Sequence, residues 1–170
     1  MEQPSDFGFI PMKNVLIALD LDPSARKVAE VGYSIAKTMN ANVLLLHVVE
    51  DDVYYSSLEY SPVTGFSGFS NSDFTIMANS EGLIQASQYF LEKTREHLHD
   101  ESIQIISDKG DFPDTILKKA KEMNADLIVM GSHSRRWLDQ VLMGSVTEKV
   151  LHHTSIPLLI IPTKGKKKQL

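Results

Sequence analysis

The sequence predicts an α/β fold in which a doubly wound, five-stranded parallel sheet carries helices on both faces. Short apolar runs recur along the 170 residues, and segments with helical periodicity separate them. The runs are continuous rather than alternating, which is typical of strands buried on both faces of a parallel sheet. Strands that alternate with helices form right-handed βαβ units, and a chain of this length has room for a single domain.

Five segments are predicted to be strands. Four are the apolar runs 15–19, 43–49, 127–130 and 157–161. The fifth, 102–107, has polar residues among its apolar ones, as expected of a strand with one exposed flank. We therefore expect this fifth strand at an edge of the sheet.

The strand nearest the C-terminus is expected to form the other edge. It holds Leu158, Leu159, Ile160 and Ile161 without a charged residue. A bare apolar edge invites pairing with another chain. A second copy that pairs through the same residues would cover it, so we predict a two-fold homodimer.

Four segments keep one apolar face at helical spacing. They are residues 25–39, 83–98, 116–123 and 146–151. We expect the first helix to begin with Asp22 as N-cap and Pro23 at its first position. The third is expected to be entered through Asp111. The fourth should begin near Ser145, because Ser145 and Glu148 have the spacing of a capping box.

The composition excludes several classes of protein. Hydrophobic residues make up 42% and charged residues 23%, as in soluble globular proteins. With no cysteine, the chain has no disulfide, thiolate zinc site, iron–sulfur cluster or Cys nucleophile. The net charge of −5 argues against a duplex nucleic-acid partner. The N-terminus does not resemble a signal peptide, and no apolar run approaches the ~20 residues of a membrane span. We therefore expect a cytoplasmic protein.

Two segments lie outside the alternation of strands and helices. Residues 51–79 hold six of the aromatic residues among Ser, Gly and Pro. A loop this long is a lid, a partner surface or a mobile insertion without a specific role, and the sequence leaves these alternatives open. The Lys-rich end, 164–170, is interpreted as a solvated tail.

Candidate ligand contacts follow the strands, because ligands of open parallel sheets bind beyond the carboxyl ends at the switch point of the strand order. Asp20 follows the first strand, and Val48 lies at the end of the second. After the fourth, Gly131 ends a strand and Gly144 precedes a helix, which can bring backbone N–H groups and a positive helix end around an anion. Neither a Walker A motif nor a Gly-x-Gly-x-x-Gly motif is present.

These residues resemble the universal stress protein family over 12–162. The resemblance is carried by Asp20, His47-Val48, Gly110 and the run from Met130-Gly131-Ser-His to Gly144-Ser145-Val-Thr-Glu148. It implies a sheet ordered 3-2-1-4-5, a homodimer and, in one branch of the family, a bound ATP or AMP.

That nucleotide-binding branch carries the motif Gly-x2-Gly-x9-Gly-Ser/Thr. Here it falls on Gly131, Ser134, Gly144 and Ser145, with serine in place of the second glycine. The serine either occupies space that a phosphate needs or donates its hydroxyl to a phosphate oxygen. The binding residues that the resemblance implies are Ala18, Asp20, Val48, Met130, Gly131, His133, Ser134, Arg135, Gly144, Ser145, Val146 and Thr147.

Each of these roles has a structural alternative. Asp20 accepts from a ribose hydroxyl or holds Mg²⁺ through water, or it is a turn residue. Ser145 contacts a phosphate, caps its helix, or does both. Val48 offers backbone groups to an adenine edge or is a core valine. Arg135 supplies positive charge.

No catalytic group or metal site can be named from the sequence. Adjacent residues such as Ser132-His133-Ser134 do not form a nucleophile and base pair, and a Gly-x-Ser-x-Gly elbow is absent. The pairs His97/His99 and His152/His153 lack the i, i+4 spacing of helical metal ligands. Residues 137–142 are expected to form a short packed helix rather than a cofactor box.

The sequence therefore predicts a homodimeric stress-response regulator or sensor that binds ATP or AMP with slow or no hydrolysis. The alternative is a dimeric interaction protein of the same family that binds no nucleotide, with 51–79 as its contact surface. Ser134 favours that alternative. A nucleotide-hydrolysing or nucleotide-transferring enzyme is the third possibility.

Overall fold

The computed structural model describes residues 11–49, 80–132 and 144–163. Within these ranges strands and helices alternate along the chain. The strands are β1 (Asn14–Leu19), β2 (Asn42–Val49), β3 (Gln104–Lys109), β4 (Leu127–Gly131) and β5 (Leu158–Ile161). The helices are α1 (Ala25–Thr38), α4 (Ser80–Leu98), α5 (Phe112–Glu122) and α6 (Ser145–His153).

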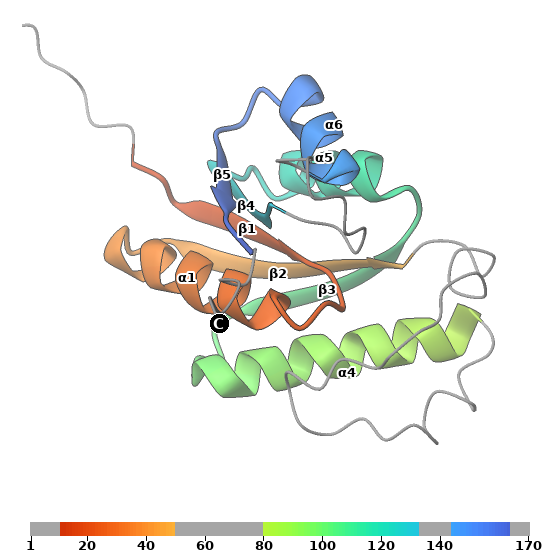
Figure 1. The fold of residues 1–170 in the computed structure, drawn as a ribbon. Coiled ribbons are helices and arrows are strands. Elements are labelled where there is room, and N and C mark those ends of the chain that lie inside the picture. The colour runs from red at the N-terminus through yellow and green to blue at the C-terminus, as the bar shows by residue number, and fades with distance from the viewer. Residues whose placement is uncertain (1–10, 50–79, 133–143, 164–170) are drawn as a thin grey trace, which may run out of the picture.

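The strands form one parallel sheet in the order β3-β2-β1-β4-β5. Helices α1 and α4 lie on one face of this sheet, and α5 and α6 lie on the other (Figure 1). The predicted doubly wound fold and strand order are confirmed, and β3 is an edge strand as expected. The chain leaves β1 toward one face and β4 toward the other, so the switch point lies between these two strands.

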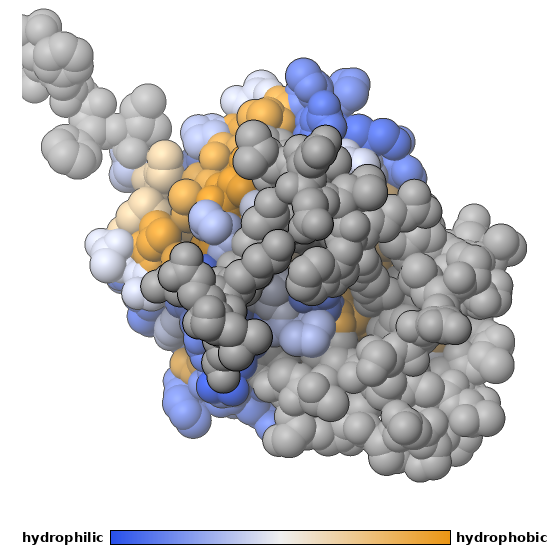
Figure 2. All heavy atoms as spheres, in the orientation of Figure 1, coloured by the Kyte–Doolittle hydropathy of each residue, from blue (hydrophilic) through white to orange (hydrophobic). Residues whose placement is uncertain are grey.

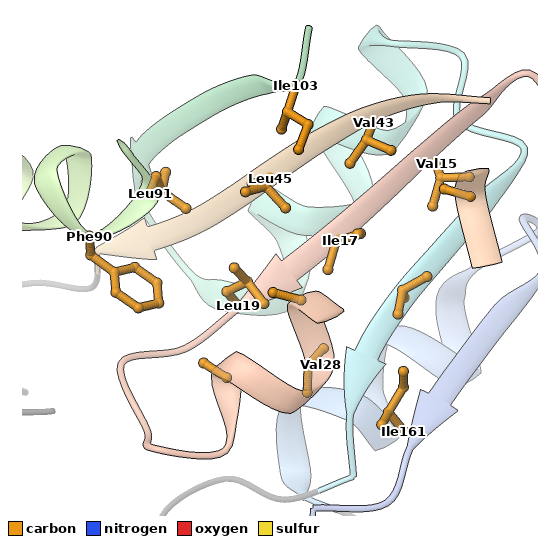
Figure 3. Close-up of a cluster of buried hydrophobic side chains, with 14 of the residues drawn as sticks. Val15, Ile17, Leu19, Val28, Val43, Leu45, Phe90, Leu91, Ile103 and Ile161 are labelled. Atoms are coloured by element: carbon orange, nitrogen blue, oxygen red, sulfur yellow. The ribbon is translucent and has the colours of Figure 1, made fainter. Parts of the chain in front are cut away.

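Each face of the sheet packs against its own pair of helices. On the α1 and α4 side, Val15, Ile17 and Leu45 belong to one buried cluster with Phe90 and Leu91 of α4 and the apolar stripe of α1 (Figure 3). The alternate residues of the same strands pack against α5 and α6 on the other side. Because both faces are covered, the central strands need an apolar residue at every position, which explains their continuous runs.

Helix α1 lies very close to the sheet at the switch point. A Cβ atom added to Gly32 would lie 3.0 Å from Ile17 Cδ1 and 3.0 Å from Val129 Cγ1. A side chain at this position would therefore push α1 away from β1 and β4.

Polar side chains tie together the amino ends of the strands. Asp126 Oδ2 accepts hydrogen bonds from the backbone N–H groups of Lys13 (2.7 Å) and Asn14 (3.0 Å). The Asn14 amide donates to the carbonyl of Asn124 at 3.2 Å, and the Asn42 amide donates to Asn14 Oδ1 at 3.1 Å. These contacts join the starts of β1, β2 and β4.

The predicted start of α1 is wrong, whereas α6 begins at Ser145 as predicted but without the predicted capping box. The Asp22 carboxylate accepts from the Ser24 N–H at 2.9 Å in a turn, so α1 begins at Ala25 with Ser24 as N-cap. In α6 the Gly144 carbonyl accepts the first helical bond, from Glu148 N at 2.9 Å. Gly144 is therefore the N-cap and no side chain caps this helix, so the Ser145–Glu148 capping box does not form.

The start of α5 is as predicted, because Asp111 Oδ1 accepts from Asp114 N at 3.2 Å. Strand β3 begins at Gln104 rather than at 102. The chain before it turns around Asp100, whose carboxylate accepts from Ser102 N at 3.0 Å. None of the helices in the described ranges is long and apolar enough to cross a membrane.

Candidate functional site

A hollow opens at the carboxyl ends of β1, β2 and β4, at the switch point. It encloses about 830 Å³, including space open to solvent. The strands and the chain directly after them contribute Ala18, Leu19, Asp20, Leu21, Leu46, His47, Val48, Met130 and Gly131. The first turns of the surrounding helices contribute Ser24, Ala25, Val28, Phe112, Ile116, Val146 and Thr147. Among these lining residues Asp20 is the one carboxylate, and none is Lys or Arg.

Asp20 stands where the chain leaves β1 for α1. Its Oδ1 accepts from the Asp22 N–H at 3.2 Å, which is the turn role that the sequence allowed. Asp20 also lines the hollow, so the turn role and a ligand contact are compatible.

The backbone of Val48 faces the switch point. In β2 the Asn42 N–H donates to Lys13 of the β1 side, whereas the Val49 carbonyl accepts from Gly110 on the β3 side. Backbone groups alternate in direction along a strand, so those of Val48 point toward β1. The β1–β2 register ends at the pair Leu19 and His47. Val48, which lines the hollow, therefore turns its backbone toward the β1 side directly after the last strand pair.

His47 borders the hollow and is buried, with 3% of its surface exposed. Its Nδ1 lies 2.7 Å from Ser87 Oγ in α4, and Ser107 Oγ of β3 donates to Ser87 Oγ at 2.6 Å. Because the Ser87 oxygen accepts from Ser107, the Ser87 hydroxyl proton is available to His47 Nδ1. The chain of hydrogen bonds fixes the His47 ring against α4, where Phe90 also packs edge-on.

The turn between β4 and α6 is held together at its base. The Gly144 N–H donates to the Ser132 carbonyl at 2.8 Å, and Thr147 Oγ1 donates to the Gly131 carbonyl at 3.0 Å. A Cβ atom on Gly131 would lie 3.1 Å from Thr163 Cγ2 and 3.2 Å from Val28 Cγ2, so the glycine permits close packing there. The start of α6, with its unpaired N–H groups and positive helix end, thus lies beside the end of β4.

The turn into α5 places Phe112 at the rim of the hollow. Gly110 has φ +150° and donates its N–H to the Val49 carbonyl at 3.0 Å. A Cβ atom at this glycine would lie 2.7 Å from Thr115 Oγ1, so a side chain there would displace the first turn of α5. The conformation of Gly110 and the Asp111 cap together set where Phe112 lies.

The structure brings together most of the predicted binding residues that it describes. Those that line the hollow are Ala18, Asp20, Val48, Met130, Gly131, Val146 and Thr147. Gly144 and Ser145 form the start of α6 next to it. His133, Ser134 and Arg135 lie outside the described residues, as do 137–142, 51–79 and the Lys-rich tail. Within the described part of the chain, His, Asp and Glu side chains form no cluster of three or more that could hold a metal ion.

Sequence reasoning found the contribution of α6 but missed those of α1 and α5. The N-cap Ser24 with Ala25 and Val28 of α1, and Phe112 and Ile116 of α5, line the hollow. For α5 a signal was present, because Gly110 and the Asp111 cap place Phe112 in a first helical turn directly after a strand. Nothing in the sequence indicated that the first turn of α1 lines the same hollow.

Comparison with known proteins agrees with this architecture. The model of the universal stress protein family matches residues 11–162. Universal stress protein MJ0577 from Methanocaldococcus jannaschii is 28% identical over 158 residues, which cover 90% of this chain and 96% of that protein. A solved structure of protein MJ0577 superimposes with a TM-score of 0.67 at 23% identity, covering 92% of this chain and 99% of that one. A universal stress protein solved in complex with cAMP superimposes with a TM-score of 0.58 at 18% identity, covering 91% and 99%.

Proposed function

The chain belongs to the universal stress protein family, and on that premise we propose that it is a cytoplasmic stress-response regulator or sensor that binds ATP or AMP. The observation that carries the proposal is the hollow at the switch point, which joins an apolar chamber to the β4–α6 turn. A structural neighbour was solved with cAMP, which supports an adenine nucleotide as the ligand.

The apolar part of the hollow suits an adenine ring. Leu46, Met130 and Ile116 line it, and all three are buried. Burial of a flat apolar ring against such side chains is favourable, and a few placed polar groups then fix its orientation. The backbone of Val48 would contact the edge of the base, and the Asp20 carboxylate would accept from a ribose hydroxyl.

The β4–α6 turn suits the phosphates. The first N–H groups of a helix have no partner within the helix and bind anions. Ser145 and the residues directly after it present those groups, because the N–H of the N-cap residue Gly144 already donates to the Ser132 carbonyl. Gly131, at the end of β4, would lie beside the bound phosphates. Arg135 would add positive charge, and Ser134 would either contact a phosphate or crowd it.

The same geometry favours binding without rapid hydrolysis. Among the described lining residues, Asp20 and His47 are the candidates for a general base. Both already have hydrogen-bond partners, with Asp20 bonded to Asp22 N and His47 close to Ser87. We therefore propose that the described lining residues bind and orient a nucleotide rather than activate water, with or without Mg²⁺.

Calorimetry and thermal unfolding with millimolar ATP, AMP and Mg²⁺ test the proposal. Binding should release heat and raise the melting temperature. Asp20→Ala should weaken binding by about tenfold or more, because it removes a charged hydrogen-bond partner. Asp22→Ala is the matched control, since it breaks the neighbouring turn but is not a lining residue. If neither nucleotide binds the unaltered protein, the non-nucleotide interaction protein replaces this proposal.

Ser134→Gly separates the two roles of the serine. Tighter binding on substitution would identify Ser134 as a steric obstacle, and binding weakened by about one net hydrogen bond, ~0.5–1.5 kcal/mol, would identify it as a phosphate donor. An unchanged Kd would place Ser134 outside the site.

We also propose a homodimer through β5. Leu158, Leu159 and Ile160 are half-buried in the isolated chain, and β5 is the last strand of the sheet. Figure 2 shows apolar residues gathered at the surface where Figure 1 places β5. A second copy that pairs along this edge would cover the strand's outward backbone groups and these side chains.

A further inference from the structure

Ser132 lies where three segments of the chain meet at the hollow. It follows β4 directly and is 8% exposed. Its N–H donates to the Ile161 carbonyl of β5 at 2.9 Å, and its carbonyl accepts from Gly144 N at 2.8 Å. Its hydroxyl oxygen accepts from Thr163 N at 3.1 Å. One residue thus links the end of β4, the start of α6 and the chain that leaves β5.

The bond to Gly144 sets the position of the helix start. This bond joins Ser132 and Gly144, the two described residues that flank 133–143, and so keeps Gly144 and Ser145 beside Gly131. The Thr147 hydroxyl holds the same helix to the Gly131 carbonyl one turn later. These two bonds fix α6 against β4 within the described residues.

The hydroxyl of Ser132 holds the chain after β5 against the same turn. Thr163 packs on Gly131, where its methyl group would meet an added Cβ at 3.1 Å. The carbonyl of the preceding Pro162 accepts from Lys27 Nζ of α1. The chain leaving β5 therefore lies between α1 and the turn that presents the α6 N–H groups.

We propose that Ser132 is a positioning residue that joins the phosphate side of the hollow to the chain leaving β5. The inference rests on the proposed nucleotide binding and adds the contact through which a bound phosphate affects the chain that leaves β5. Helix N–H groups bind an anion well when neighbouring hydrogen bonds hold them in place beforehand. Coupling is reciprocal, so a phosphate on the turn also stiffens the Thr163 segment.

Ser132→Ala tests the positioning role through ligands that differ in their phosphates. The variant should bind ATP about two- to tenfold more weakly, the worth of one net hydrogen bond, and should bind adenosine as the unaltered protein does. Ser132→Thr keeps the hydroxyl and should restore ATP binding. Thr154→Ala is the matched control. Its hydroxyl likewise accepts from a nearby backbone N–H, that of Ile156 at 2.9 Å, but Thr154 is the C-cap of α6, at the opposite end of that helix from the hollow.

Hydrogen–deuterium exchange tests the link to β5. In the unaltered protein and in Thr154→Ala, ATP should slow exchange of the backbone N–H groups of Ile161 and Thr163 more than adenosine does. In Ser132→Ala that difference should disappear. Thr163→Pro removes the N–H that donates to Ser132 without changing any residue of β4 or of the β4–α6 turn, so it should weaken ATP binding in the same way. This second variant keeps the test decisive if Ser132→Ala does not fold.

The outcomes separate this inference from the function on which it rests. If the unaltered protein binds neither ATP nor AMP, the proposed function fails and the inference falls with it. If it binds ATP but Ser132→Ala and Thr163→Pro bind ATP equally well, the inference alone is overturned. A loss of affinity that is equal for ATP and adenosine would also overturn it, because it would show a general structural role.

Discussion

At the scale of single residues, the ends of three helices share a left-handed backbone conformation with positive φ. Asn40, His99 and Asn124 have φ of 53°, 53° and 51° and follow α1, α4 and α5. Asparagine adopts left-handed conformations with little strain, whereas other residues with a Cβ atom pay about 1–2 kcal/mol. His99 is exposed and is the residue least suited to its position.

His99→Gly should therefore raise the free energy of unfolding by about 1 kcal/mol, because glycine adopts positive φ without steric strain. Urea denaturation of both proteins measures the change. Asn124→Gly is the matched control at an equivalent helix end and should change stability less. A loss of stability in His99→Gly would show that the imidazole contributes more than its backbone conformation costs.

At the scale of elements, the sequence specified where strands and helices lie better than how they begin. The strands of the core were predictable because apolar runs flanked by turn residues leave few alternatives. The N-cap of α1 and the capping box of α6 were wrongly predicted because Asp22 and Ser145 are suitable caps, and the structure satisfies the backbone differently. Asp22 uses its carboxylate in the turn before α1, and the bond between Gly144 and Ser132 sets the start of α6. Such choices depend on contacts between distant residues, which a local pattern does not contain.

The direction of backbone groups in β5 predicts different effects for two neighbouring substitutions. The carbonyls of Pro157 and Ile161 accept from Ile128 N and Ser132 N of the β4 side, both at 2.9 Å. By alternation, Leu159 also faces β4 and Ile160 faces the open edge. Leu159→Pro should lower the melting temperature, and Ile160→Pro should leave a folded monomer. Analytical ultracentrifugation and thermal melts of both variants decide between these outcomes. An unaltered protein that sediments as a 19.0 kDa monomer at micromolar concentration would end the dimer proposal.

Asp100 links α1 to the turn before β3, and its titration should be visible in acid unfolding. Hydrogen bonds from Ser102, Tyr33 and Lys37 hold the pKa of this carboxyl well below its usual range. Because the folded-state pKa is lowered, the stabilisation is complete above the unfolded-state pKa of about 3.9 and is lost as the pH falls through the folded value.

Asp100→Asn should therefore be less stable than the unaltered protein at neutral pH, and the difference should shrink steadily below about pH 4. Chemical denaturation at a series of pH values measures it. A difference that stays constant down to pH 2 would mean that the effect comes from hydrogen-bond geometry rather than from charge. Asp114→Asn serves as the control at another exposed carboxylate.

At the scale of the whole molecule, the two ends of the sheet have different roles. The carboxyl ends of β1, β2 and β4 form the hollow. Asp20, Val48 and Gly131, which were chosen for their positions at the ends of strands, line it. The lining residues of α1 and α5 could not be found this way, because their approach depends on the close contact at Gly32 and on the turn at Gly110. The amino ends instead carry the polar contacts around Asp126.

This division predicts that stability and binding can be altered separately. Asp126→Ala removes the acceptor for Lys13 N and Asn14 N and should lower the free energy of unfolding by about 1–3 kcal/mol. Its Kd for ATP at 25 °C should not change, since the folded fraction still presents an intact hollow. Asp20→Asn keeps an oxygen for Asp22 N and removes the charge, so it should weaken binding with little loss of stability. Denaturation and calorimetry on both variants measure the two effects. If Asp126→Ala weakens ATP binding as much as Asp20→Asn does, the two ends of the sheet are coupled, because a strand displaced at one end would then shift the ligand contacts at the other.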